Sequence, residues 1–221
     1  FSYLGDIWAA NENGTDPQRL TVHKSRDVYP RFSPDGRWIA FSSNRYGNYD
    51  VFLIPATGGQ PRRLTFHSGA DTVVGWTPDS KRVLFQASRG LLFSGVPNLY
   101  EVSVDGGLEQ PLPTDWGYWG SYSPDGSKLA FNRHGMPWWR KHYRGSRAND
   151  VWVMDVASKS FRRLDADSRV NSAWPLYAAS GDIYFVSDRL PNEKTVKPGA
   201  PEVLQSANNL WKIPERGGAP V

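Results

Sequence analysis

Residues 29–65 read YPRFSPDGRWIAFSSNRYGNYDVFLIPATGGQPRRLT, and the rest of the chain is built on the same plan. Short apolar runs alternate with turn residues, first Ser33-Pro34-Asp35-Gly36 and later Thr57-Gly58-Gly59. In the first turn, proline presets φ, aspartate bonds the nearby backbone and glycine accepts a positive φ. The pattern predicts an antiparallel meander of four short strands. Their predicted ranges are 29–33, 38–43, 50–54 and 61–65.

The same turn returns further along the chain, as Thr77-Pro78-Asp79-Ser80 and as Ser123-Pro124-Asp125-Gly126. A second phrase opens an apolar run five times, as Asp6-Ile7-Trp8, Asp50-Val51-Phe52, Asn98-Leu99-Tyr100, Asp150-Val151-Trp152 and Asn209-Leu210-Trp211. Thirteen residues after the Asp or Asn of the first four come Arg19-Leu20, Arg63-Leu64, Pro111-Leu112 and Arg163-Leu164. Repeats of about 45 residues with several short strands are typical of β-propeller blades rather than of a helical solenoid. We therefore interpret the turn residues as blade architecture.

The repeats divide the chain into five blade units, and we expect them to form a single all-β propeller domain of four-stranded antiparallel blades. The unit boundaries are approximately 1–28, 29–72, 73–117, 118–170 and 171–221. Three units are predicted to be complete and two incomplete. The first unit is expected to keep only its two outer strands, and the last to lack its outer strand. On this interpretation the chain is truncated at both ends.

The same pattern predicts the strands of the remaining units. The predicted ranges are 7–11 and 18–22 in the first unit, 73–77, 82–87, 99–104 and 109–113 in the third, 119–123, 128–133, 151–155 and 160–165 in the fourth, and 173–177, 183–187 and 210–214 in the fifth. Leucines of the Arg-Leu pairs are expected in the core. Their arginines are expected to bridge to the acidic turn of the next blade.

Composition fits packed sheets and excludes several classes of protein. Ten Trp, ten Tyr and ten Phe stand against two Met among 221 residues, and broad rings fill the space between twisted blades. There is no Cys, which rules out disulfides, thiolate catalysis and Cys-based zinc sites. No apolar run reaches about 18 residues, so we expect no membrane span. The net charge of +4 is modest and dispersed, which argues against a dedicated nucleic-acid binder.

The expected compartment of the protein follows from the first residues of the chain. The sequence begins inside a repeat, and no basic, apolar and small-residue leader precedes it. We expect the true N-terminus to be absent. On this ground we favour a cytoplasmic location over a periplasmic or secreted one.

The connections between the second and third strands of successive units grow in length. The distance from the turn Asp to the Asp or Asn that opens the third strand is 15 residues from Asp35, 19 from Asp79 and 25 from Asp125. In a meander these connections all leave from the same end of the blades. We therefore expect the loops at 89–97, 133–149 and 190–208 to share one face, and loops on a rigid scaffold are where binding usually occurs.

The loop of the fourth unit is the candidate binding loop. Its candidate residues are Trp138, Trp139, Arg140, His142, Tyr143 and Arg144. Three interpretations stay open. The tryptophans pack onto the domain under arginine stems, or the loop docks a peptide or a domain, or its rings and cations bind nucleic acid. We place nucleic acid last, since one loop is a small electrostatic footprint.

No catalytic residue, cofactor site or metal site is expected in the chain. There is no GxSxG elbow, and the four histidines, His23, His67, His134 and His142, have no paired acid at a recognised spacing. The oxygen-rich stretch Asn11–Asp16 lacks the acidic spacing of a calcium loop. His67 follows a predicted fourth strand, so we expect it to cap a blade junction.

The repeated sequence motifs resemble those of a known family. The SPDG turn, with a following strand, Asp-Val-Trp and Arg-Leu-Thr, is similar to TolB-like propellers. The amino-terminal propeller of tricorn protease and its homologues is a more specific resemblance. It is carried by Val73-Val74-Gly75-Trp76-Thr77-Pro78-Asp79, by Trp138-Trp139-Arg140-Lys141-His142-Tyr143-Arg144-Gly145 with Asp150-Val151-Trp152-Val153, and by Ile183-Tyr184-Phe185-Val186-Ser187-Asp188-Arg189. It covers nearly the whole chain.

That resemblance implies a function for the chain. In the tricorn family this region is a six-bladed propeller ahead of a second propeller, a PDZ domain and a serine-peptidase module. The chain would then supply about five of six blades and none of the peptidase. The leading hypothesis is a non-catalytic propeller domain that shapes a substrate or product channel, or docks peptides and neighbouring domains.

Two other functions remain as alternatives: a freestanding TolB-like propeller that binds a protein, and the propeller cap of a dipeptidyl-peptidase-type hydrolase. The expected partners are peptides, downstream protease domains or another protein, with neither nucleic acid nor membrane among them. Self-association through open sheet edges is a further expectation, because an incomplete ring exposes unpaired backbone groups.

Overall fold

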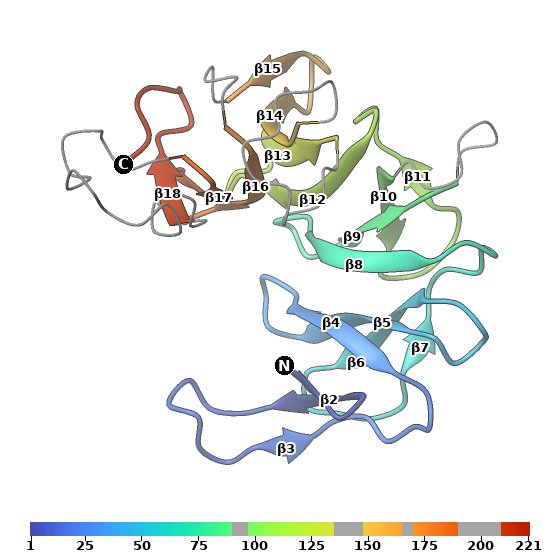
Figure 1. Ribbon diagram of the computed structural model, residues 1–221. Coiled ribbons are helices and arrows are strands. Elements are labelled where there is room, and N and C mark those ends of the chain that lie inside the picture. The colour runs from blue at the N-terminus through green and yellow to red at the C-terminus, as the bar shows by residue number, and fades with distance from the viewer. Residues whose placement is uncertain (90–96, 135–147, 165–169, 190–208) are drawn as a thin grey trace. The chain divides into compact units, whose positions relative to one another are not determined.

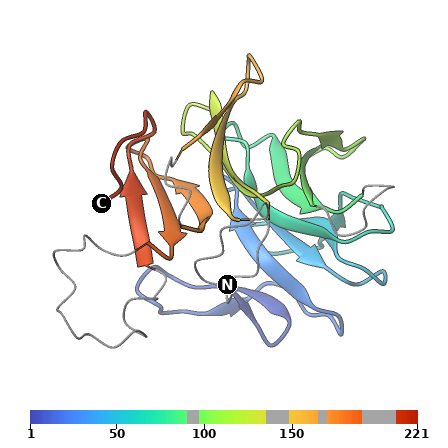
Figure 2. The ribbon, with the colours of Figure 1, turned by 45° about the horizontal axis from the view of Figure 1, so that its top comes forward.

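The computed structural model describes residues 1–89, 97–134, 148–164, 170–189 and 209–221. Every regular element in these ranges is a β-strand (Figure 1). The chain divides into two compact units, Phe1–Pro113 and Thr114–Val221, which are described in turn. Within each sheet the strands lie side by side in both ribbon views (Figure 1, Figure 2).

The first unit contains three antiparallel sheets. One has the order β1-β2-β3, the next β4-β5-β6-β7, and the third β11-β10-β9-β8. Their strands are β1 Ser2–Tyr3, β2 Asp6–Ala9, β3 Gln18–Arg19, β4 Asp27–Phe32, β5 Trp38–Ser43, β6 Asp50–Pro55, β7 Arg62–Arg63, β8 Asp71–Trp76, β9 Arg82–Ala87, β10 Asn98–Ser103 and β11 Gln110–Pro111.

The second unit contains two antiparallel sheets, with the orders β12-β13-β14-β15 and β16-β17-β18. Their strands are β12 Gly117–Tyr122, β13 Lys128–Arg133, β14 Asp150–Asp155, β15 Phe161–Arg163, β16 Ser172–Tyr177, β17 Ile183–Ser187 and β18 Asn209–Ile213. The described residues therefore form three four-stranded and two three-stranded blades. This confirms the predicted all-β class, with three complete and two incomplete units.

The first blade corrects one detail of the prediction. It was expected to keep only two strands, but β1 adds a third, with Ser2 paired to Ile7 and Tyr3 to Asp6. The turn between β1 and β2 is Leu4-Gly5, with φ of 50° and 90°. Two positive φ values suit a two-residue hairpin. The two-residue strand is too short for apolar alternation to reveal it.

The SPDG turns are built as predicted. Ser33 Oγ donates to Asp35 Oδ1 at 2.6 Å, and the Arg37 N–H donates to the same oxygen at 3.1 Å. Equivalent bonds join Thr77 to Asp79 and Ser123 to Asp125. These bonds stabilise the ionised carboxylates. The hydrogen bond from Ser33 is the main cause that lowers the pKa of Asp35 to about 2.

Each unit buries its core between neighbouring sheets. In the first unit, Val51 and Leu53 from β6 pack with Val73 from β8 and Phe85 from β9. The second unit repeats this arrangement with residues from β13, β14, β16, β17 and β18. The central phenylalanines of the second strands are fully or almost fully buried, and they are Phe41, Phe85, Phe131 and Phe185. A blade therefore covers the apolar face of its neighbour within the unit.

Candidate functional site

Charged side chains gather at one end of each blade. In an antiparallel meander, the first and third strands begin where the second and fourth strands end. In the second blade this end holds Asp27 at the start of β4, Arg45 just after β5, Asp50 at the start of β6 and Arg63 at the end of β7. The connection between the second and third strands leaves from the same end, which we call the loop end.

The first kind of ion pair joins the start of the first strand to the residue two places after the second strand. Asp27 pairs with Arg45 at 2.7 Å and Asp71 pairs with Arg89 at 2.7 Å. Both aspartate side chains are fully buried. Arg89 also lies 3.6 Å from a carboxylate oxygen of Glu109. Each acid thus fixes the stem of the connection that follows the second strand.

Aromatic rings support these two arginines. The Arg45 guanidinium lies 5.0 Å from the ring centre of Phe52, and the Arg89 guanidinium lies 4.8 Å from that of Tyr100. Both rings come from the third strand of the same blade. Cation–π contact adds to the attraction of the carboxylate. The arginine stems are thereby held on two sides.

The second kind of ion pair corrects the predicted role of the Arg-Leu pairs. Arg63 pairs with Asp50 of its own blade at 2.8 Å, not with the acidic turn of the next blade. The same pair joins Arg19 to Asp6 and Arg163 to Asp150. The reason is topological, because the fourth strand runs antiparallel to the third and its end returns to the start of the third. The prediction that the leucines of these pairs lie in the core is confirmed for Leu64 and Leu164, which are buried.

The third blade replaces this second ion pair by a neutral contact. Asn98 stands where the first, second and fourth blades have an Asp, and Pro111 stands where those three blades have an Arg. The fifth blade also has an asparagine at this strand start, Asn209. The Asn98 Nδ2 donates to the Leu112 carbonyl at 3.1 Å. The position therefore accepts either a charged pair or an amide with no arginine opposite.

Burial is the largest influence on the pKa of two of these acids, Asp50 and Asp71. It raises the pKa of Asp71 even though Arg89 and the Thr65 hydroxyl act in the opposite direction. Burial also raises the pKa of Asp50 against the effect of Arg63. The two carboxylates are close enough that Asp50 adds to the rise at Asp71. The arginines therefore compensate buried charge rather than add surplus stability.

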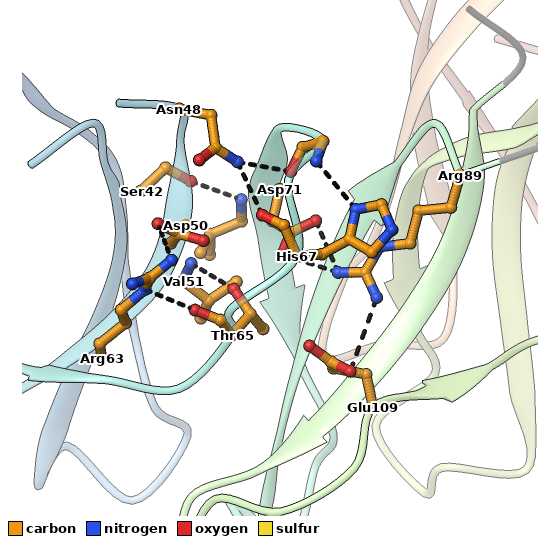
Figure 3. Close-up of polar contacts among 12 residues, drawn as sticks. Ser42, Asn48, Asp50, Val51, Arg63, Thr65, His67, Asp71, Arg89 and Glu109 are labelled. Atoms are coloured by element: carbon orange, nitrogen blue, oxygen red, sulfur yellow. Dashed lines mark hydrogen bonds and ion pairs between the residues drawn. The ribbon is translucent and has the colours of Figure 1, made fainter. Parts of the chain in front are cut away.

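Figure 3 shows how the second and third blades are joined beside these pairs. The Asn48 Nδ2 donates to the carbonyls of His67 at 2.9 Å and Gly69 at 2.7 Å. His67 Nδ1 accepts the Gly69 N–H at 2.8 Å. The Asp71 N–H donates to the Tyr49 carbonyl at 2.7 Å. His67 thus caps the junction, as the sequence predicts.

A repeated motif that the sequence interpretation missed builds this junction. Thr21-Val22-His23 recurs as Thr65-Phe66-His67, and each precedes a buried Asp by four residues. The threonine hydroxyls accept the N–H groups of Ile7 and Val51, both at 2.9 Å. The signal was present as Thr-x-His-x-x-x-Asp at a spacing of 44 residues. Histidines considered one at a time did not reveal it.

The second unit has its own version of the loop end. Arg189 lies two residues after β17, and its guanidinium donates to the hydroxyls of Ser187 at 3.2 Å and Ser172 at 3.3 Å. The ring centres of Phe185 and Trp211 lie 5.3 and 5.4 Å from it. Burial lowers the pKa of Arg189 to about 10. Ser172 occupies the strand start where the second and third blades have Asp.

The candidate binding loop lies outside the described residues. This applies to all six of its predicted residues, which are Trp138, Trp139, Arg140, His142, Tyr143 and Arg144. Of the three long connections, only the stems are described. Two of those stems end in arginines of the loop end, Arg89 and Arg189.

The described part of the loop end is an arrangement of paired charges. Within the five described ranges, no group of three or more His, Asp or Glu residues could hold a metal ion. None of the elements in those ranges is a helix that could span a membrane. The acids of the first and second blades' loop ends are engaged by arginines, among them Asp6, Asp27 and Asp50. This arrangement fixes loops in place.

Comparison with known proteins finds similarity along almost the whole chain. The family described as the tricorn protease N-terminal beta propeller domain matches residues 1–220. A tricorn protease homologue, homolog 2 of Streptomyces coelicolor, is 34% identical over 201 residues. That match covers 83% of this chain and 16% of the relative. The chain therefore spans about a sixth of the length of this curated relative.

Solved structures share the fold. A protein from Agrobacterium tumefaciens described as TolB superposes with a TM-score of 0.74 and 23% identity, covering 98% of this chain and 73% of that one. A crystal structure of tricorn protease gives a TM-score of 0.74 and 22% identity, covering 98% of this chain and 20% of that one. These likenesses support the assignment of the sheets as propeller blades.

Proposed function

The chain belongs to the family of tricorn protease N-terminal β-propeller domains, and from that premise we propose that it is a non-catalytic domain of a tricorn-like serine protease. In this role it shapes a passage for substrate or product, or docks peptides and neighbouring protease domains. The observation that carries the proposal is the loop end. There, buried acids such as Asp27 and Asp71 are matched to arginines that form the loop stems.

This pairing suits a scaffold better than a reaction centre. A catalytic acid or base needs a proton that it can exchange with a substrate. Asp27 and Asp71 are instead fully buried under Arg45 and Arg89. What such pairs supply is fixed geometry for the loops that leave beside them. Loops held in this way can line a passage or receive a peptide.

The test uses the natural full-length protein that carries this chain. Residues 135–147 are replaced by a short Gly-Ser linker, and a matched variant changes the exposed hairpin residue Leu108 to Ser. Hydrolysis is measured on peptides of increasing length, and a serine-reactive phosphonate counts the working active sites. We expect the linker variant to change kcat/KM with peptide length while the phosphonate titre stays constant. An unchanged kcat/KM at every length contradicts the proposal.

Catalysis by the chain itself is tested separately. The purified 221-residue chain is incubated with the same peptides, beside the full-length protein. We expect no cleavage. Cleavage that disappears when one side chain of this chain is changed would show that the domain is itself an enzyme.

A further inference from the structure

Three connections at the loop end of the first unit form one continuous surface. They are residues 20–26, 44–49 and 64–70. The Arg26 N–H donates to Asn44 Oδ1 at 2.7 Å, and the Asn44 N–H donates back to the Arg26 carbonyl at 3.2 Å. On the other side, Asn48 donates to two carbonyls of the connection 64–70, at 2.9 and 2.7 Å. The middle connection is thus bonded to both of its neighbours.

This surface exposes large apolar side chains. Val22 is 77% exposed, Tyr46 is 66% exposed and Phe66 is 69% exposed. Val22 and Phe66 occupy the middle of the repeated Thr-x-His motif, whose flanking residues form the junction bonds. The fold therefore uses the threonine and the histidine, while the apolar residue between them faces solvent. Contiguous exposed apolar side chains often mark an interaction site, and Tyr46 and Phe66 both lie against the guanidinium of Arg63.

The Tyr46 and Phe66 rings are both held in place by Arg63. The Arg63 guanidinium lies 4.6 Å from the ring centre of Tyr46 and 4.7 Å from that of Phe66. Arg63 is itself fixed by its ion pair with Asp50. The Tyr46 ring also stacks on Phe52, with 6.3 Å between ring centres. Rings that are already ordered lose little entropy when a partner binds.

The charge of this surface is positive. The three connections contain Lys24, Arg26 and Arg45 and no Asp or Glu. Arg45 is neutralised by the buried Asp27. Lys24 and Arg26 are exposed, and no ion pair joins either of them to another described residue. Two exposed cations therefore lie on the connection that carries Val22, and this connection is bonded to the one that carries Tyr46.

We propose that this surface, defined by Val22, Lys24, Arg26, Tyr46 and Phe66 and called the loop-end patch, docks a protein segment in which apolar side chains alternate with Asp or Glu. Val22, Tyr46 and Phe66 contact the apolar side chains of the docked segment, and Lys24 and Arg26 attract its carboxylates. Nucleic acid fits less well, because two cations neutralise few phosphates. The inference rests on the docking role proposed above and names the class of segment docked.

Binding is measured by fluorescence anisotropy with the full-length protein and a labelled peptide, acetyl-Glu-Phe-Glu-Leu-Glu-Phe-Glu. A second peptide carries Lys in place of every Glu. One variant combines Tyr46→Ser with Phe66→Ser, and another combines Lys24→Glu with Arg26→Glu. The control is Leu108→Ser, which removes a side chain 90% exposed in the hairpin at the opposite end of its blade.

We expect the acidic peptide to bind, the basic peptide not to bind, and each patch variant to weaken binding about ten-fold or more, which corresponds to about 1.4 kcal/mol. Added salt should weaken the binding of the acidic peptide to the unchanged protein. The Leu108 control should bind like the unchanged protein. The charge-reversal variant leaves the packed rings intact, so its result does not depend on the folding of the ring variant.

Three results would overturn the inference. Equal binding of the acidic and basic peptides is one, and unchanged binding in both patch variants is another. The third is a single-stranded oligonucleotide that binds more tightly than the acidic peptide and is lost in the same variants. The proposed function has its own readout, the length dependence of peptide hydrolysis, so the two can fail separately.

Discussion

The Asp50 carboxylate lies 2.8 Å from the Arg63 guanidinium, and the acid side chain is fully buried while the arginine is 21% exposed. Thirteen residues separate the two in the sequence. The third and fourth strands of the blade bring them together, and the threonine that follows completes the contact, because Arg63 Nε donates to the Thr65 carbonyl at 2.7 Å. The pair is therefore a product of the meander itself.

Removing the arginine should cost more than removing the acid. Arg63→Ala leaves a buried carboxylate without its cation, and we expect a loss of about 3–5 kcal/mol in the free energy of unfolding. Asp50→Asn should cost less, because Arg63 keeps the Thr65 carbonyl and the ring of Tyr46. Urea unfolding followed by tryptophan fluorescence measures both values. Equal losses in the two variants would contradict the asymmetry.

An exposed ion pair provides the control for that comparison. Arg133 lies 3.4 Å from Asp115, whose side chain is 74% exposed. Water screens such pairs, so Asp115→Asn, which leaves the contact of Arg133 with the Trp152 ring in place, should cost about 0–1 kcal/mol. A cost as large as that of Arg63→Ala would show that burial is not what distinguishes the two pairs.

The buried acid Asp71 should give stability a definite dependence on pH. Its folded-state pKa is raised above the unfolded value, chiefly by burial. The native state therefore binds the proton more tightly, and this contribution is fully present below the unfolded pKa and is lost as pH rises through the folded pKa. Asp71→Asn removes the titration. Measured by urea unfolding between about pH 4 and about pH 7, the unchanged protein should lose stability relative to the variant as pH rises.

The turn acid Asp125 should show the opposite slope. Hydrogen bonds, first of all from Ser123, lower its pKa from 3.8 to about 2. Its contribution is present above the unfolded pKa and is lost as pH falls through the folded pKa. Asp125→Ala should therefore lower the melting temperature at neutral pH, and the difference from the unchanged protein should shrink between about pH 4 and about pH 2. A constant difference across this window would show that the carboxylate charge is not involved.

Asn48 should control the opening of the junction between the second and third blades. Asn48→Ala removes two hydrogen bonds to the connection 64–70, and we expect it to favour local opening by about 1–3 kcal/mol. Hydrogen exchange should then accelerate at the amides of Gly69 and Asp71. Asn11→Ala in an exposed turn of the first blade is the matched control and should leave those amides unchanged. Unaltered exchange in Asn48→Ala would mean that other bonds hold the junction.

Much of the fold follows from local chemistry. Strands β5, β9, β13 and β17 lie at the predicted residues. Each follows a turn whose residues can be recognised in the sequence, either as a Ser/Thr-Pro-Asp turn or, before β17, as a degraded version of it. Strand β1 was missed, since two residues cannot display alternation. The terminal strands β7 and β11 are shorter than predicted, because only Arg62–Arg63 and Gln110–Pro111 pair with their neighbours.

The candidate site was harder to predict than the fold. The spacing between Asp50 and Arg63 was visible, yet the partner of the arginine depends on strand register, which the spacing does not state. The pair of Asp71 and Arg89 joins the start of one strand to the residues that follow the next strand. Its only signal in the sequence is that Asp27 and Arg45 recur 44 residues later as Asp71 and Arg89. The predicted candidate loop itself lies outside the described residues.

The third blade shows that a blade can form without such a pair. Asn98 and Pro111 stand in place of Asp50 and Arg63, so both partners have changed together. A blade with the proline alone would carry a buried carboxylate with no cation, whereas a blade with the asparagine alone would keep an arginine near the surface. The second of these single changes is the milder one. Asparagine is therefore the replacement that such a blade should tolerate alone, whereas proline needs the asparagine beside it.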